Sequence, residues 1–235
     1  RLACQICPSR DVAVQPILAE AVPAQGFGRP SYSDGEELEV SILFADLRGF
    51  TKMSDKRLPY DVVFILNRYF AEMGVAIEGA GGRIDKFIGD GIMALFGVDN
   101  TLPEGSRAAL RAAKAMAENL KTLNESLKND LDEPLRIGIG IHGGPAIVGE
   151  LGYRKTRGLT AVGDTVNTAS RLETLTKDFT AQLVVSGEVA VAAGVNLSDY
   201  PIENVVIRGR EEQLPVHIVG DASELPLRSG GVVAI

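Results

Sequence analysis

The sequence contains no tryptophan and only two cysteines, Cys4 and Cys7, which both lie near its start. Two cysteines cannot build the disulfide framework that stabilises many small secreted domains. The longest apolar runs, near residues 62–66 and 189–195, are far shorter than the ~20 residues that span a bilayer. No signal-peptide pattern is present either. We therefore expect a cytoplasmic globular domain without membrane contact.

The sequence also lacks a run of basic residues, since 24 Lys and Arg face 31 Asp and Glu for a net charge of -7. This balance argues against a nucleic-acid or anionic-membrane surface, although a few local cations could still hold an anionic ligand. With 235 residues, 45% hydrophobic and 23% charged, the chain is long enough to bury a core without disulfide or metal support.

Composition divides the chain into four segments. Residues 19–36 are rich in Pro, Gly, Ala and Ser, as in a linker, and residues 221–235 are expected to form a loose tail. Residues 1–18 contain both cysteines. The run RLACQIC followed by DVAV resembles the last cluster cysteine and closing strand of adrenodoxin-type two-iron ferredoxins. That resemblance implies a remnant of a ferredoxin domain without its other ligands, so we expect no Fe-S cluster here. The alternative is a frayed terminus with two incidental cysteines.

Residues 37–220 carry the periodic patterns of the main domain. The patterns predict strands and helices in the order β-α-β-β-α-β, the ferredoxin-like unit of an α+β fold, with one further helix and three further strands. The expected ranges of the unit are 39–46, 59–79, 83–87, 92–96, 104–127 and 135–142. The expected additions are a helix over 164–176 and strands near Leu183, Val206 and Val216.

Two aspartates occupy positions where this topology brings them together. Asp46 ends the first strand, and Asp90 lies in the turn of the hairpin next to it. Carboxylate oxygens suit Mg²⁺ when substrate phosphates complete the coordination shell. A pair of metals about 3.5–4 Å apart would then serve an in-line phosphoryl or nucleotidyl displacement. The alternative is that Asp46 caps the next element and Asp90 only serves a tight turn.

Three sequence blocks together closely resemble the catalytic domain of class III nucleotidyl cyclases. They are FADLRGFT at 44–51, KFIGDG at 86–91, and LTAVGDTVN with ASRLE over 159–173. The resemblance implies a homodimer with shared active sites and two Mg²⁺ or Mn²⁺ ions per site. It also implies that ATP is converted to 3′,5′-cyclic AMP and pyrophosphate.

The resemblance further assigns roles to single residues. Asp46, Asp90 and the main chain at Leu47 match metal ligands, and Gly49, Phe50 and Thr51 match the turn that holds the triphosphate. Asn167 and Arg171, one helical turn apart, match the residues that position the ribose and stabilise charge on the α-phosphate. Arg208 matches a lysine that binds the terminal phosphates, and Arg210 could do so instead.

The choice of base depends on Lys86 and Thr160, which match the purine-reading pair of the family. Adenine presents an acceptor at N1 and a donor at N6, which suit a lysine and a hydroxyl that can accept. Guanine reverses this pattern, and guanylyl members carry a glutamate where Lys86 stands. Threonine instead of the commoner aspartate at position 160 resembles a subclass that includes bicarbonate-responsive cyclases.

Three other interpretations stay open from the sequence. One is a guanylate or dual-specificity cyclase, and another is a catalytically weak module that binds nucleotide for regulation. The third is a diguanylate cyclase or polymerase palm, which shares the β-α-β-β-α-β unit and the paired aspartates but does not explain the block with Asn167 and Arg171.

Overall fold

A computed structural model describes residues 35–227, except for residues 56, 153–157 and 210–211. These residues belong to one of the two units into which the chain divides, Tyr32–Ile235. The predicted ferredoxin remnant, with Cys4 and Cys7, and most of the predicted linker lie outside the described residues. The described residues contain no helix that is both long and apolar enough to cross a membrane.

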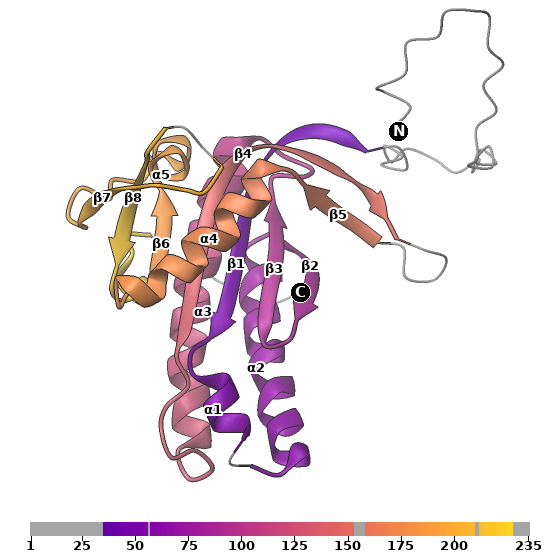
Figure 1. Cartoon of the computed structure of the whole chain (residues 1–235), viewed down its shortest axis with the longest axis vertical. Coiled ribbons are helices and arrows are strands. Elements are labelled where there is room, and N and C mark those ends of the chain that lie inside the picture. Colours follow the sequence, from indigo (N-terminus) through magenta and orange to yellow (C-terminus); the bar gives the residue numbers. More distant parts are fainter. Residues whose placement is uncertain (1–34, 56, 153–157, 210–211, 228–235) are drawn as a thin grey trace, which may run out of the picture. The chain divides into compact units, whose positions relative to one another are not determined.

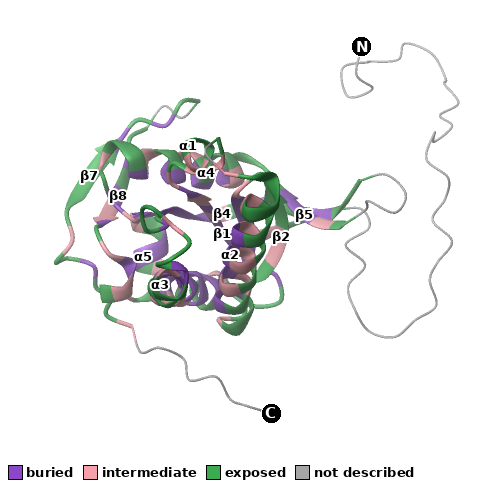
Figure 2. Ribbon diagram, turned by 90° about the horizontal axis from the view of Figure 1, so that it is seen from below, coloured by how far each residue is buried: buried purple, intermediate pink, exposed green. Residues whose placement is uncertain are grey.

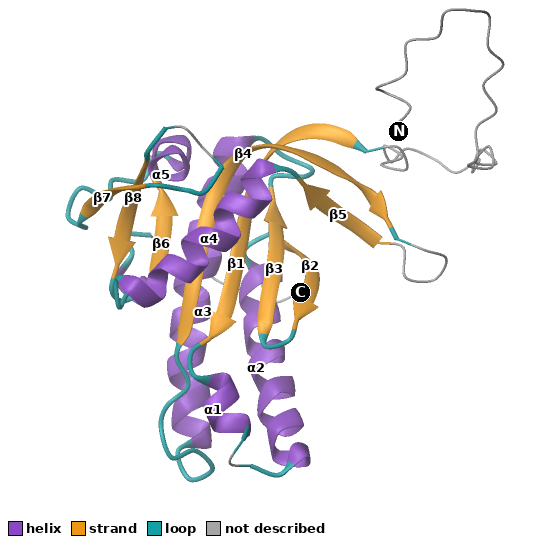
Figure 3. Cartoon of the chain, viewed as in Figure 1, coloured by secondary structure: helices purple, strands orange, loops and turns teal. Residues whose placement is uncertain are grey.

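The fold is the expected α+β arrangement, built on one mixed sheet with the strand order β2-β3-β1-β4-β6-β8-β7 (Figures 1 and 3). The pair of β4 and β6 is parallel, and the other neighbours along this path are antiparallel. The strands are β1 (Glu36–Leu47), β2 (Arg83–Ile88), β3 (Gly91–Phe96), β4 (Ile137–Leu151), β6 (Leu183–Ser186), β7 (Ile202–Val205) and β8 (Leu214–Val219).

Helices cover both faces of this sheet. The long helices α2 (Pro59–Gly79) and α3 (Leu102–Leu127) lie on one face, and α4 (Asp164–Asp178) lies on the other (Figures 1 and 2). α3 begins with a capping box, because the Glu104 carboxylate accepts a hydrogen bond of 3.1 Å from the backbone N–H of Thr101 and the Thr101 side chain accepts one from the backbone N–H of Glu104. The main core forms where α2 and α3 pack on the sheet, around Tyr69, Met116 and Ile139.

The structure contains elements that the sequence patterns did not predict. Two short helices, α1 (Phe50–Ser54) and α5 (Gly187–Ala193), lie in segments to which the periodic patterns assigned no helix or strand. β4 also continues to Leu151 and pairs there with β5 (Gly158–Val162), so a two-stranded extension projects past the sheet (Figure 3). β4 has fifteen residues and contains several glycines. Glycines weaken the alternation of apolar residues that reveals a strand, so the sequence patterns predicted only the first part of β4.

The expectation of a loose tail from residue 221 is wrong for its first residues. A 3-10 turn over Ala222–Glu224 follows β8, and both Ala222 and Leu225 are buried in the main core. The Lys114 side chain on α3 also donates hydrogen bonds to the carbonyls of Leu225 and Leu227, each at 2.8 Å. Two small apolar side chains in a polar segment give too weak a pattern to predict this packing.

α4 approaches the sheet where β4 has glycines. A Cβ on Gly140 would lie 2.7 Å from the Cα of Glu173 and closer still to its amide nitrogen. One on Gly138 would overlap the Arg48 guanidinium. The absence of side chains at these two positions therefore sets how closely α4, with its predicted site residues, packs on β4.

We predict that Gly140→Ala destabilises the fold, because the added methyl group meets backbone atoms of α4 that cannot rotate away. The expected loss is at least about 1–3 kcal/mol of the free energy of unfolding, typical of an overpacked core. Urea unfolding measures it. Gly79→Ala, at a helical position with open space around it, is the matched control and should not destabilise. Equal stability of Gly140→Ala and the parent chain would contradict the proposed close contact.

Candidate active site

The two predicted metal ligands lie together at one end of the sheet. Ala45 on β1 pairs with Ile92 on β3, so Asp46 comes next to the turn that carries Asp90. A Cβ on Gly91 would lie 3.1 Å from the Ile88 carbonyl oxygen and 3.3 Å from the Asp46 carboxylate oxygen, so a side chain at this position would crowd that carboxylate. Burial raises the pKa of Asp90, and so do the negative charge of Asp46 and a hydrogen bond with it.

This pair of carboxylates is suited to a divalent cation. Two nearby negative charges repel each other, and a cation between them would remove that repulsion. No group of three or more His, Cys, Asp or Glu side chains in the described segments could hold a metal ion. The remaining ligands of a metal bound by Asp46 and Asp90 would therefore come from main-chain carbonyls, water or substrate phosphates. Leu47, which ends β1, has its side chain buried in the core.

The sequence analysis did not identify Tyr69 as part of this site. This side chain on α2 is fully buried, and its hydroxyl has no hydrogen-bond partner within the described residues. Burial raises the pKa of Tyr69 above its usual value, and the negative charges of Asp46, Asp90 and Glu173 add to the effect. Tyr69 thus keeps its proton beside the acidic groups. Its position on the apolar face of a helix gave only the signal of a core residue.

Glu173 on α4 is a buried carboxyl group near the two half-buried aspartates. Burial raises the pKa of Glu173, the charge of Asp46 raises it further, and Arg48 lowers it. Arg48 Nη2 lies 3.0 Å from Glu173 Oε1 and donates a hydrogen bond of 3.2 Å to the Glu173 carbonyl. The two side chains are close enough to form an ion pair. They are not aligned as a hydrogen bond, since Glu173 Oε1 has no hydrogen-bond partner within the described residues. The contact connects the residue after Leu47 directly to α4.

The two predicted base-reading residues touch each other. Lys86 on β2 donates a hydrogen bond of 2.9 Å to the hydroxyl of Thr160 on β5. The Thr160 hydroxyl in turn donates one of 2.5 Å to Asp85, whose carboxylate also lies 3.5 Å from the Lys86 ammonium. Asp85 was not predicted as a site residue, because it lies just before the block at residues 86–91 and a single acidic residue gives no signal of its own.

The remaining predicted site residues lie on or near α4 and α1. Asn167 is exposed on α4, and Arg171 one turn later is half-buried and donates a hydrogen bond to the Arg208 carbonyl. Arg208 is exposed, whereas Arg210 lies outside the described residues. Gly49, with a φ of 70°, makes the turn from β1 into α1, and Phe50 and Thr51 open that helix.

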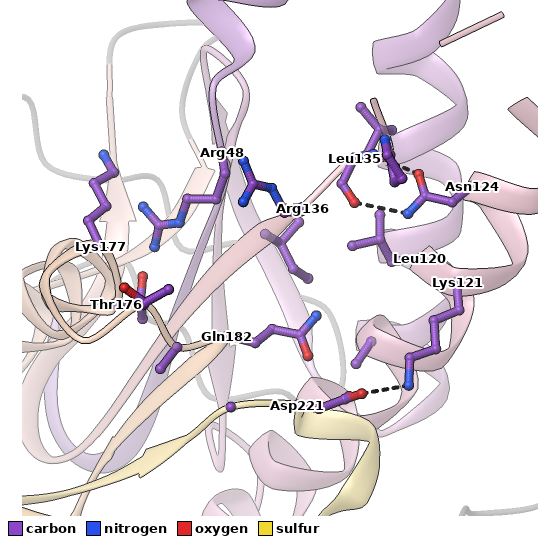
Figure 4. Close-up of a pocket in the computed structure, with 16 residues that line it drawn as sticks. Arg48, Leu120, Lys121, Asn124, Leu135, Arg136, Thr176, Lys177, Gln182 and Asp221 are labelled. Atoms are coloured by element: carbon purple, nitrogen blue, oxygen red, sulfur yellow. Dashed lines mark hydrogen bonds and ion pairs between the residues drawn. The ribbon is translucent and has the colours of Figure 1, made fainter. Parts of the chain in front are cut away.

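A cationic cavity of about 540 Å³ adjoins the end of β1 and the start of β4 (Figure 4). Arg48, Arg136, Lys177 and Lys121 line it, and the Lys121 ammonium forms an ion pair of 2.7 Å with Asp221. The positive charge of Lys177 also lowers the pKa of Asp90. The cavity therefore adds positive charge near Asp46 and Asp90. Apart from Arg48, the residues that supply this charge lie outside the sequence blocks.

We predict that Arg48→Met destabilises the apo protein more at neutral pH than at pH 5. The folded state holds the Glu173 proton more tightly than the unfolded chain, so the free energy of unfolding falls as pH rises between the two pKa values. Loss of Arg48 raises the folded-state pKa further and widens this interval. Removing one partner of a buried ion pair costs about 3–5 kcal/mol.

Urea unfolding at both pH values, without metal, measures this effect. The double variant Arg48→Met/Glu173→Gln is the control and should recover most of the stability with a smaller pH dependence. If the two variants show the same pH dependence, Glu173 is not the titrating group.

Comparisons with known proteins identify the family to which this chain is similar. The family model described as the adenylate and guanylate cyclase catalytic domain matches residues 33–219. Adenylate cyclase of Anabaena cylindrica is 34% identical over 208 residues, which are 84% of this chain and 40% of that protein. Adenylate cyclase 1 of Rhizobium meliloti is 31% identical over 83% of this chain and 30% of its own length. The chain thus spans well under half of these two relatives.

Solved structures give the same result for the fold. The guanylyl cyclase Cya2 superposes with a TM-score of 0.72 and 32% identity, over 83% of this chain and 99% of that one. The adenylyl cyclase CyaB from P. aeruginosa superposes with a TM-score of 0.70 and 27% identity, over 80% of this chain and 96% of that one. The chain therefore belongs to the family of adenylate and guanylate cyclase catalytic domains.

Proposed function

We propose that this chain is an adenylate cyclase that converts ATP to 3′,5′-cyclic AMP and pyrophosphate. The 3′-oxygen of the ribose forms a bond to the α-phosphorus, the bond from that phosphorus to the bridging oxygen of the β-phosphate breaks, and the 3′-hydroxyl proton is released. The observation that carries the proposal is the contact between Lys86 and Thr160, because family membership alone allows either purine.

The Lys86 and Thr160 side chains match adenine better than guanine. The Lys86 ammonium can only donate, and adenine N1 is an acceptor. The Thr160 hydroxyl accepts from Lys86 and has a second lone pair that can accept from adenine N6. Guanine would present an N1–H donor to the ammonium, and it would present O6, an acceptor, to a hydroxyl whose proton is already engaged. Both contacts with guanine would be mismatched.

Asp46 and Asp90 would hold divalent metal ions, Mg²⁺ or Mn²⁺, at the end of the sheet. When bound, the ions would lower the pKa of the attacking 3′-hydroxyl and balance charge on the leaving pyrophosphate. The backbone N–H groups at Gly49, Phe50 and Thr51 would bind the triphosphate, since the first N–H groups of a helix lack intrahelical acceptors. α1 has only five residues, so these N–H groups matter more than its macrodipole.

The α4 side chains would act on the sugar and the α-phosphate. Asn167 would position the ribose, and the Arg171 guanidinium would stabilise the charge that develops on the α-phosphate. Arg208 would bind the terminal phosphates, and the hydrogen bond from Arg171 to its carbonyl fixes the two residues relative to each other.

We further propose that two copies of the chain form each site. Asp46 and Asp90 would come from one protomer, and Lys86, Thr160, Asn167 and Arg171 from the other. Large apolar side chains that a monomer would leave in water support a partner on β2 and on the β4–β5 extension. They are Phe87, Ile88, Ile147, Leu151 and Val162, each at least 41% exposed.

The direct test is an assay of the purified chain with ATP and Mg²⁺ or Mn²⁺, scored for cyclic AMP. We predict that Asp46→Asn and Asp90→Asn each lower the rate at least about 100-fold, since each removes a charge that binds the metals and tenfold in rate is about 1.4 kcal/mol. Thermal unfolding of both variants checks that the fold survives. Full Mg²⁺-dependent activity in either variant would refute this metal site.

The shared site predicts complementation between two inactive variants. In a mixed dimer of Asp46→Ala and Arg171→Ala, one site carries both substitutions and the other carries neither. Random pairing makes half of the dimers mixed, each with one intact site, so roughly a quarter of the parent activity should return. The mixture is assayed where parent chains exchange and well above the dimer dissociation constant. A mixture as inactive as each variant alone would exclude shared sites.

A further inference from the structure

Asp85 lies at an irregularity of β2 that changes where its side chain points. Ile84 pairs with Ala94 and Lys86 pairs with the adjacent Met93, so Asp85 is the extra residue of a β-bulge. Consecutive side chains of a regular strand point to opposite faces. Here, however, Asp85 and Lys86 both reach the Thr160 hydroxyl on β5. The bulge therefore places a carboxylate beside the base-reading pair, as bulges near active sites often do.

The two hydrogen bonds of the Thr160 hydroxyl leave it able to act only as an acceptor toward a bound base. A hydroxyl has one proton to donate and two lone pairs to accept. The proton goes to the Asp85 carboxylate at 2.5 Å, and one lone pair accepts from Lys86 at 2.9 Å. A carboxylate can only accept, and the Asp85 side chain is only 3% exposed, so water does not compete for it. The remaining lone pair can only accept a hydrogen bond.

We propose that Asp85 is a positioning residue for base selection, which fixes the Thr160 hydroxyl as an acceptor for the adenine N6 amino group. The inference rests on the proposed function, because it concerns the same base-binding site. Asp85 and Thr160 together do what an aspartate at position 160 would do alone: they present an acceptor that cannot turn into a donor. A threonine alone could rotate its hydroxyl and donate to guanine O6.

The test compares ATP and GTP in Asp85→Asn. The asparagine amide can donate as well as accept, so the Thr160 proton becomes free to turn toward guanine O6. We expect the ratio of kcat/KM for ATP to that for GTP to fall by about tenfold, the effect of one buried hydrogen bond. Asp99→Asn is the matched control. Asp99 is exposed, and its carboxylate lies 3.5 Å from the guanidinium of Arg83, which is on β2 like Asp85. The ratio in Asp99→Asn should equal that of the parent chain.

A second substrate separates this role from an effect on Lys86 or on folding. Purine riboside triphosphate keeps N1 but lacks the N6 amino group, so it cannot use the Thr160 lone pair. Asp85→Asn should therefore change kcat/KM for this compound much less than for ATP. An equal loss with both substrates would mean that Asp85 acts through Lys86 or through the fold, and would overturn the proposal.

A second variant, in which the carboxylate is moved from position 85 to position 160, keeps the proposal testable even if Asp85→Asn alone is poorly folded. Asp85→Asn/Thr160→Asp keeps one carboxylate at the base and should regain most of the preference for ATP. Thr160→Asp alone places two carboxylates side by side and should perform worse than the double variant. If Asp85→Asn keeps the parent ATP-to-GTP ratio, or if the double variant prefers ATP no more than Asp85→Asn does, the proposal is wrong. If the parent chain cyclises neither nucleotide, it is instead the proposed function that fails.

Discussion

The concentration of negative charge at one end of the sheet is the constraint on which the site depends. Burial raises the pKa values of Asp90, Glu173 and Tyr69 there, and the negative charge of Asp46 raises all three further. Such a group is stable only if cations compensate it. Arg48 compensates Glu173 within the chain, and the aspartates would gain the same compensation from divalent metal. The fold thus accepts electrostatic strain in the apo state that metal binding would relieve.

The close approach of α4 to β4 connects this charge to the rest of the molecule. α4 buries Ala169 and Leu172 against the sheet and presents Asn167 to solvent. The Arg48–Glu173 ion pair joins the same helix to the residue that follows the end of β1. Within one protomer, this contact therefore joins the end of the strand that carries Asp46, a proposed metal ligand, to the helix that carries Asn167 and Arg171.

The sequence predicted the parts of the fold and site that local patterns encode. The helix over Pro59–Gly79 was predicted with its observed ends because a proline opens it and its apolar residues repeat at helical spacing. The convergence of Asp46 and Asp90 followed from topology. Tyr69, Asp85 and Arg136 were missed because their importance arises from contacts between distant segments. The bulge at Asp85 depends on how β2 pairs with β3, and one extra residue in a short strand leaves no clear mark in the pattern of apolar residues.

An acidic chain can still serve a highly anionic nucleotide, because charge acts locally. Interactions between exposed charges are screened within about 8 Å at physiological ionic strength, so the net charge of -7 has little effect inside a site. What a triphosphate would meet is the local set of donors and cations, proposed here as the N–H groups of Gly49 to Thr51 and the Arg208 side chain, while Arg136 and Lys177 add positive charge at the cavity beside β1. The sequence has no run of basic residues. A protein that binds nucleic acid needs positive charge along an extended surface, whereas a site for a single nucleotide would need positive charge only around its phosphates.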